Sequence, residues 1–94
     1  MKDEIFEWDD DKALINFRKH GISFEEARGV FEDPYAITVD DATHSEFEPR
    51  YVTIGLSLIS RVLIVVHTDR EYTIRIISAR KATPSERAQY ESQR

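Results

Sequence analysis

The chain of 94 residues contains no cysteine, only three glycines and three prolines, and no long apolar run. Without cysteine, a disulfide framework and a thiolate metal site are both excluded. No apolar segment approaches the roughly 20 residues of a membrane-spanning helix, and charged residues follow Met1 where a signal peptide would be apolar. The three glycines are scattered and form no phosphate-binding loop. These absences predict a cytoplasmic protein with no membrane contact and no cofactor.

Histidine is also rare, and its three positions carry no metal-binding spacing. His20, His44 and His67 lie far apart in the chain, without a His-x-x-His pair. The acidic run at residues 9–11 lacks the spacing of a calcium-binding loop, and helix capping explains it. No serine lies in a recognisable nucleophile elbow. We therefore expect no metal site and no serine-based hydrolysis.

Charge, by contrast, is plentiful and unevenly distributed. Residues 1–48 hold 14 acidic and 5 basic residues, a charge of −9, whereas residues 49–94 hold 4 acidic and 8 basic residues, a charge of +4. This division predicts one acidic and one basic face, and a basic face can meet phosphate. Two solvated surfaces with no partner would give the same totals.

Three segments have the local signals of helices. Residues 10–20 follow the N-cap candidate Asp9, carry Leu14 and Phe17 on one face, and end at Gly21. Ser23 and Glu26 have the spacing of a capping box at the start of a second helix, in which an apolar stripe precedes Asp33-Pro34. A second capping box, Thr83 to Glu86 with proline at the first helical position, predicts a helix over residues 84–92.

The hydrophobic period changes from 3.6 to 2 after Pro34. This alternation predicts four strands, at residues 35–40, 50–58, 61–68 and 72–80, and short connections make them antiparallel. Residues 4–8 also alternate and could form a short edge strand. The prediction is a single α+β domain over residues 1–94, with two N-terminal helices, a four-stranded antiparallel sheet and a C-terminal helix. With so few helices, one sheet face can remain uncovered.

The last predicted hairpin, VVHTDREYTIRIISAR, interrupts a β-branched run with basic side chains. RNA can be cleaved without a metal when its own 2′-hydroxyl attacks the phosphate. The protein then supplies a base, an acid and positive charge for the developing phosphorane. Histidine can transfer the protons and arginine can hold the phosphate. The residues of this kind in the hairpin and its exit are His67, Arg70, Arg75, Arg80 and Lys81.

Strand parity argues against a regular hairpin as the site. A turn at Arg70-Glu71 would place His67 opposite Ile74 and Val66 opposite Arg75, so His67 and Arg75 would lie on different faces. Arg75 and Arg80 also differ in parity. A bulge or a different turn length would be needed to bring such residues together. His67 could equally be a half-buried strand histidine bonded to its neighbours.

Several segments, in this order, are similar to the BrnT family, the toxin halves of bacterial type II toxin–antitoxin pairs. They are FEWDDDKALINFRKHGISFEEA, FEDP, RYVTIGLS, RVLIVVHTDR and RIISARKATPSERAQYE, and they extend from about Ile5 to Glu91. The resemblance implies a RelE-like fold and an endoribonuclease that inhibits translation. It also implies neutralisation by a ribbon–helix–helix antitoxin, BrnA-like, in a hetero-oligomer that contacts operator DNA only through the antitoxin.

The resemblance further implies roles for the basic and polar residues in the matching motifs. The expected catalytic residues are His67, Arg75, Arg80 and His20, and the expected substrate-binding residues are Lys19, Thr68, Arg70, Ser78 and Lys81. The arginines would hold phosphate, and His67 or His20 would move protons. The alternative is a non-catalytic binding module that acts as co-repressor with a DNA-binding partner.

Overall fold

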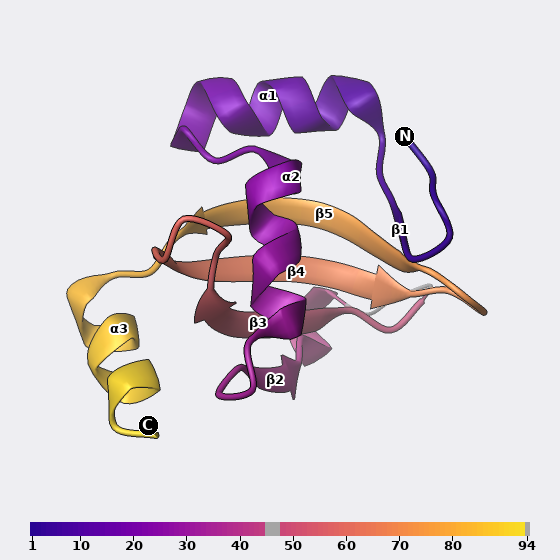
Figure 1. Ribbon diagram of the computed structural model, residues 1–94. Coiled ribbons are helices and arrows are strands. Elements are labelled where there is room, and N and C mark those ends of the chain that lie inside the picture. Colours follow the sequence, from indigo (N-terminus) through magenta and orange to yellow (C-terminus); the bar gives the residue numbers. More distant parts are fainter. Residues whose placement is uncertain (45–47, 94) are drawn as a thin grey trace.

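The computed structural model describes residues 1–44 and 48–93, and a twisted five-stranded sheet forms its centre (Figure 1). Part of the predicted connection between the first two strands, residues 45–47, lies outside the described residues. No helix in the described part of the chain has the length and apolar character needed to cross a membrane. The elements in chain order are β1 (Phe6–Glu7), α1 (Asp10–His20), α2 (Phe24–Ala27), the 3-10 helix η1 (Arg28–Glu32), β2 (Ile37–Asp40), the 3-10 helix η2 (Ala42–His44), β3 (Tyr51–Leu56), β4 (Val62–Asp69), β5 (Ile74–Lys81) and α3 (Pro84–Glu91).

The sheet has the order β1-β5-β4-β3-β2 and is mixed. The predicted four-stranded antiparallel sheet is therefore wrong in one respect: β1 adds a fifth strand, parallel to β5, with Phe6 beside Ile74 and Glu7 beside Arg75. A parallel neighbour needs a long crossover, and here the whole chain between β1 and β5 supplies it. The predicted edge strand at residues 4–8 thus forms, shortened to two residues.

The predicted helix ends are confirmed where a local cap defines them. Asp9 accepts a hydrogen bond from the Lys12 N–H at the start of α1, and Gly21 ends the helix in the left-handed region, at φ 72°. Thr83 and Glu86 form the complete capping box of α3. The second N-terminal helix differs from the prediction, because only four residues are α-helical before the chain tightens into η1.

The face of α1 that packs on the sheet is not the one that carries Leu14 and Phe17. Leu14 and Phe17 are exposed, whereas Asn16 is buried against β5. The Asn16 amide donates to the carbonyls of Ile22 and Ala79, at 3.0 and 2.9 Å, and accepts from the Ala79 N–H at 3.1 Å. Beyond the two residues that pair with β1, this side chain therefore occupies the hydrogen-bonding edge of β5.

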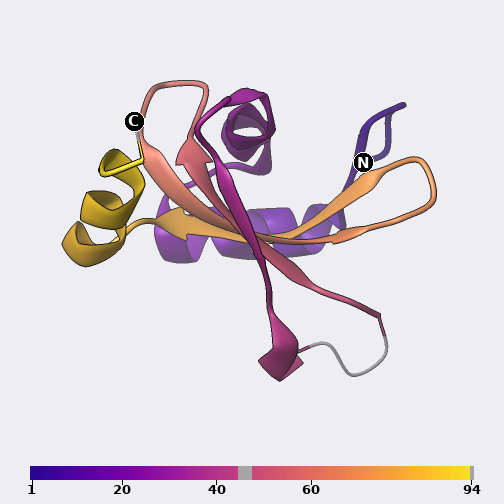
Figure 2. The ribbon, with the colours of Figure 1, turned by 90° about the horizontal axis from the view of Figure 1, so that it is seen from below.

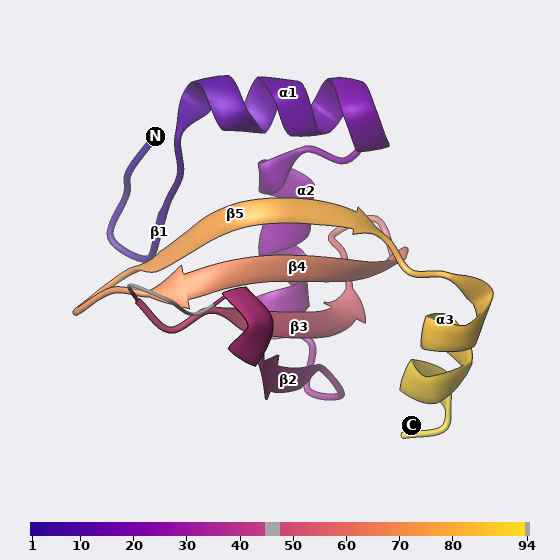
Figure 3. The same cartoon turned by 180° about the vertical axis from the view of Figure 1, so that it is seen from behind.

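The core lies between one face of the sheet and the segment α2–η1. Phe24, Ala27 and Val30 from that segment are fully buried and cluster with Leu63 and Val65 of β4. Figure 2, seen from the β2 side, shows α2 and η1 on one side of the sheet only. The other face has no such helical layer (Figure 3), and α3 flanks it at one end. We call it the uncovered face.

Candidate nucleic-acid interface

A β-bulge decides which side chains of β5 reach the uncovered face. Val66 pairs with Ser78, but the next residue of β4, His67, pairs with Ile76, so Ile77 is an extra residue in β5. The hairpin loop is also longer than the predicted turn, because Thr68 pairs with Arg75. The predicted pairing of His67 with Ile74 is therefore wrong.

The extra residue reverses the parity that had separated the two arginines. Arg75, Ser78 and Arg80 lie opposite Thr68, Val66 and Ile64, which alternate regularly along β4 and share the uncovered face. A row of predicted site residues thus runs along β5 on this face: Arg75, Ser78 and Arg80. Arg75 and Arg80 are five residues apart. At about 3.3 Å for each residue, their backbone positions lie roughly 15 Å apart.

At the hairpin end of the row, two arginines approach one carboxylate. Arg70 Nε and Arg75 Nη1 each lie 3.9 Å from an oxygen of Glu7, and the side chain of Glu7 is only 12% exposed. The Thr73 hydroxyl also donates to Glu7, at 3.3 Å. Arg70 has a further contact with Glu48, at 3.2 Å. The two guanidiniums therefore converge on one place, where they could hold a single anionic group.

At the other end of the row, Arg80 forms a two-pronged ion pair with Glu86 of α3. The two N–H···O distances are 2.8 and 3.0 Å. The Arg80 guanidinium, together with the cap bond from the Thr83 N–H, lowers the pKa of Glu86 to about 2. This pair joins α3 to the row. A second polar contact, from the Tyr90 hydroxyl to Asp33, joins α3 to the body of the domain.

His67 lies on the covered face, away from the arginine row. The residue is 3% exposed. Its ring stands almost perpendicular to the ring of Phe31, with the two ring centroids 4.9 Å apart. Nδ1 lies 3.1 Å from Asp69 and Nε2 lies 2.8 Å from the Thr53 hydroxyl. Because a carboxylate only accepts, Nδ1 donates, and the neutral ring accepts from Thr53. Burial lowers the pKa of His67, which the Asp69 carboxylate partly opposes.

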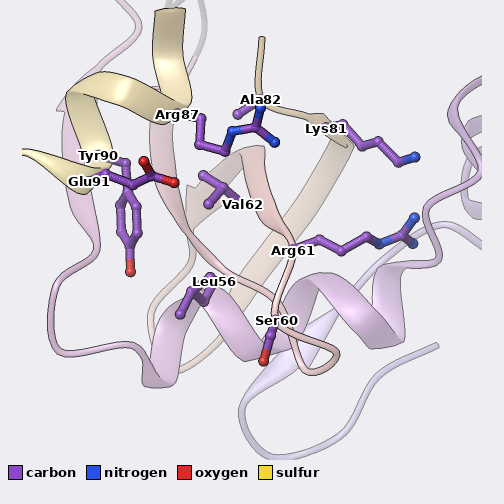
Figure 4. Close-up of a pocket in the computed structure, with 9 residues that line it drawn as sticks. All are labelled: Leu56, Ser60, Arg61, Val62, Lys81, Ala82, Arg87, Tyr90 and Glu91. Carbon is purple, nitrogen blue, oxygen red and sulfur yellow. The ribbon is translucent and has the colours of Figure 1, made fainter. Parts of the chain in front are cut away.

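The remaining predicted basic residues lie toward the far end of β5, whose last residue is Lys81. Lys81 lines a cavity of about 400 Å³ with Arg61 and Arg87 (Figure 4). Arg61 is bound to Glu26, whereas Lys81 and Arg87 make no side-chain ion pair with any described residue. Lys19 and His20 end α1 one turn after Asn16, which is bonded to Ala79, so they lie toward this same end of the sheet (Figure 1).

Thr68 and the strands beside it complete the uncovered face. Thr68 is buried, and its hydroxyl has no hydrogen-bond partner among the described residues. Between the sheet and α3 lies a groove of about 550 Å³. Its apolar floor consists of Ile37, Val39, Val52, Ile54 and Ile64. The row of arginines therefore borders an apolar surface.

Two residues of this region had no role in the sequence prediction. Glu7 reaches the arginines because β1 pairs with β5, and no local pattern announces that parallel pairing. Arg87 lies one turn into α3, within the motif RIISARKATPSERAQYE, where only its charge could have pointed to it. The structure is thus an α+β fold with cationic side chains along one uncovered sheet face.

A family model identifies the family of this chain, and a solved structure has a similar fold. The family model described as "Ribonuclease toxin, BrnT, of type II toxin-antitoxin system" matches residues 8–86. The crystal structure of the Brucella abortus ribonuclease toxin BrnT superposes with a TM-score of 0.65, at 24% identity, over 84% of this chain and 97% of that one. A search of curated protein sequences returned no match. The chain belongs to the BrnT family of ribonuclease toxins of type II toxin–antitoxin systems.

Proposed function

We propose that the chain is a metal-independent endoribonuclease that inhibits translation and is neutralised by a ribbon–helix–helix antitoxin. The observation that carries the proposal is the bulge in β5, which aligns Arg75, Ser78 and Arg80 on the uncovered face. Membership of the BrnT family supports the toxin role. The antitoxin complex would contact operator DNA through the antitoxin alone.

The scissile phosphate would lie where Arg70 and Arg75 converge. Two guanidiniums there would stabilise the charge that develops on the phosphorane. Glu7 lies between them and would take the proton from the RNA 2′-hydroxyl. The 2′-oxygen then bonds to phosphorus and the bond to the 5′-oxygen breaks, leaving a 2′,3′-cyclic phosphate and a 5′-hydroxyl.

Arg80 is too far along β5 to bind the same phosphate, so it would bind another phosphate of the same strand. Ser78 lies between the two positions and can donate to the RNA backbone. Lys81 lies opposite the core residue Leu63, so it and Arg87 would bind RNA only where the strand passes around the end of the sheet. Phosphate at Arg80 would replace the Glu86 carboxylate, since both use the same fork of donors.

His67 has a positioning role in this proposal, and His20 has none. His67 bonds to both Thr53 of β3 and Asp69 at the end of β4, and so fixes the strand beside Arg75 from the covered side. His20 ends α1 at the far end of the sheet. Because neither faces Glu7, the leaving 5′-oxygen would be protonated from water.

Arg75→Ala tests the proposal against a matched control. Arg28→Ala is the control, because Arg28 is also ion-paired with a carboxylate and has a similar side-chain exposure, 34% against 30%. We expect Arg75→Ala to lower RNA cleavage by about 10²-fold or more, and Arg28→Ala to leave it unchanged. Cleavage by the unaltered chain should continue in EDTA.

Antitoxin binding distinguishes the enzyme from the co-repressor module. If Arg75→Ala abolishes cleavage while the antitoxin still binds, the arginine acts on RNA. Loss of antitoxin binding without a detectable nuclease activity in the unaltered chain would overturn the proposal in favour of the module. Glu7→Gln should reduce cleavage as strongly as Arg75→Ala, with RNA binding retained.

A further inference from the structure

Helix α1 carries apolar side chains on its outer face, where no other element of the domain covers them. Leu14, Ile15 and Phe17 are 49%, 61% and 52% exposed, and α1 lies along the outside of the molecule above β5 (Figure 1). The inner face is already occupied, since Asn16 is buried against Ala79. Three large apolar residues within one turn of an exposed helix are more than isolated surface residues.

The outward stripe of α1 begins with an acid and ends with a base. Asp11, Leu14, Ile15 and Arg18 have the spacing i, i+3, i+4 and i+7, which places them along one side of a helix. All four are exposed. Acids in the first turn and bases in the last turn complement the helix dipole. The dipole gives no reason for the exposed apolar residues between them.

We propose that α1 pairs with α1 of a second copy of this chain, in antiparallel orientation about a two-fold axis. The axis would pass between Leu14 and Ile15, so that Leu14 packs against Leu14 of the other copy and Ile15 against its Ile15. In this register Asp11 lies opposite Arg18 of the partner, and the symmetry creates that pair twice. The stripe is therefore complementary to itself when it is reversed.

The flanking residues of α1 take no part in this contact. At 100° per residue, Asp10 and Lys19 lie on opposite sides of the stripe, and Asp10 already binds the N-terminal amine at 3.3 Å. An alignment shifted by one turn would leave Asp11 and Arg18 unmatched. A parallel pair would place acid against acid and base against base. Only the antiparallel register uses both the apolar centre and the two charge pairs between Asp11 and Arg18.

The pairing leaves the arginine row free. Arg75 and Arg80 point from the uncovered face of the sheet, whereas the stripe lies on the outer side of α1, which itself covers the edge of β5. A dimer would thus present two independent rows. Because the interface is one helix of 11 residues on each side, we expect a weak, concentration-dependent dimer and not an obligate one.

Sedimentation of the purified chain over a range of concentrations tests the proposal through two charge reversals. Arg18→Glu and Asp11→Arg should each weaken self-association by about tenfold or more, because each puts like charges opposite one another at two places. The double variant restores both pairs and should dimerise again. Both sites are exposed, so the variants should fold, which circular dichroism verifies.

Mixing the two single variants gives the sharper result. A heterodimer of Arg18→Glu with Asp11→Arg has a base opposite an acid at both places, so the mixture should associate although each variant alone does not. A chain that stays monomeric at millimolar concentration would overturn the proposal. So would a dimer that is unaffected by either reversal, or a monomer whose reversals weaken antitoxin binding, since the antitoxin would then cover this face.

Discussion

Replacing Asn16 by alanine should remove a substantial part of the folding free energy, although the residue is polar. The side chain makes three hydrogen bonds, two to Ala79 and one to Ile22, and it is only 6% exposed. Each such bond contributes about 1 kcal/mol net. Ala79 is itself buried, so its N–H and C=O would lose their partners without gaining water. The expected loss is about 3 kcal/mol.

Urea unfolding measures this loss directly. The chain has one tryptophan, Trp8, which is buried in the core, and its fluorescence reports the transition. A domain of this size has a total stability of roughly 5–14 kcal/mol, so the midpoint should fall markedly. Lys12→Ala, in the same helix but exposed, is the control and should change stability by less than about 0.5 kcal/mol.

A destabilisation below about 1 kcal/mol for Asn16→Ala would refute the reasoning. It would mean that water replaces the amide at the edge of β5. Asn16→Asp provides a second test of the same hydrogen bonds. Its carboxylate can accept from the Ala79 N–H but cannot donate to either carbonyl. We expect this variant to be no more stable than the alanine variant at neutral pH.

Three further predictions concern pH and packing. Burial depresses the pKa of His67, so its contribution to stability is present above about pH 6.5 and is lost as the pH falls; thermal melts of His67→Gln should lack this slope. The pKa of Glu86 is lowered to about 2, so its ion pair with Arg80 stabilises the fold above about pH 4.5 and is lost toward pH 2; urea titrations of Glu86→Gln should show a smaller decline over that range. A Cβ at Gly29 would lie 2.4 Å from the Leu58 backbone nitrogen, so Gly29→Ala should cost about 2 kcal/mol or more in urea unfolding, and an unchanged midpoint would contradict this close approach.

The parts of the fold that depend on neighbouring residues could be predicted from the sequence. Asp9, Gly21 and Thr83 mark helix ends because their caps involve residues only a few positions away. The alternation after Pro34 gave four strands whose ends differ from the observed ones by a few residues. Each of these features is set by local hydrogen bonds or by the period of the apolar residues.

The parts that depend on distant pairing could not be predicted. Phe6 and Glu7 alternate like any edge strand, and only the folded chain selects β5 as their parallel partner. The sequence of residues 76–78 predicts a regular strand, because no local feature distinguishes Ile77, the extra residue of the bulge, from its neighbours. Leu14 was misleading for another reason: α1 meets the rest of the fold through the buried amide of Asn16 and the small Ala13, and not through its large apolar side chains.

Because one surplus residue, Ile77, sets which way the second half of β5 points, the hairpin is constrained more by its length than by its composition. Many apolar substitutions at that position would keep the phase of the strand. Deleting the residue, or inserting one beside it, would rotate Ser78 and Arg80 by half a turn into the interior. In this strand, insertions and deletions of one residue should therefore be far rarer among active proteins than substitutions.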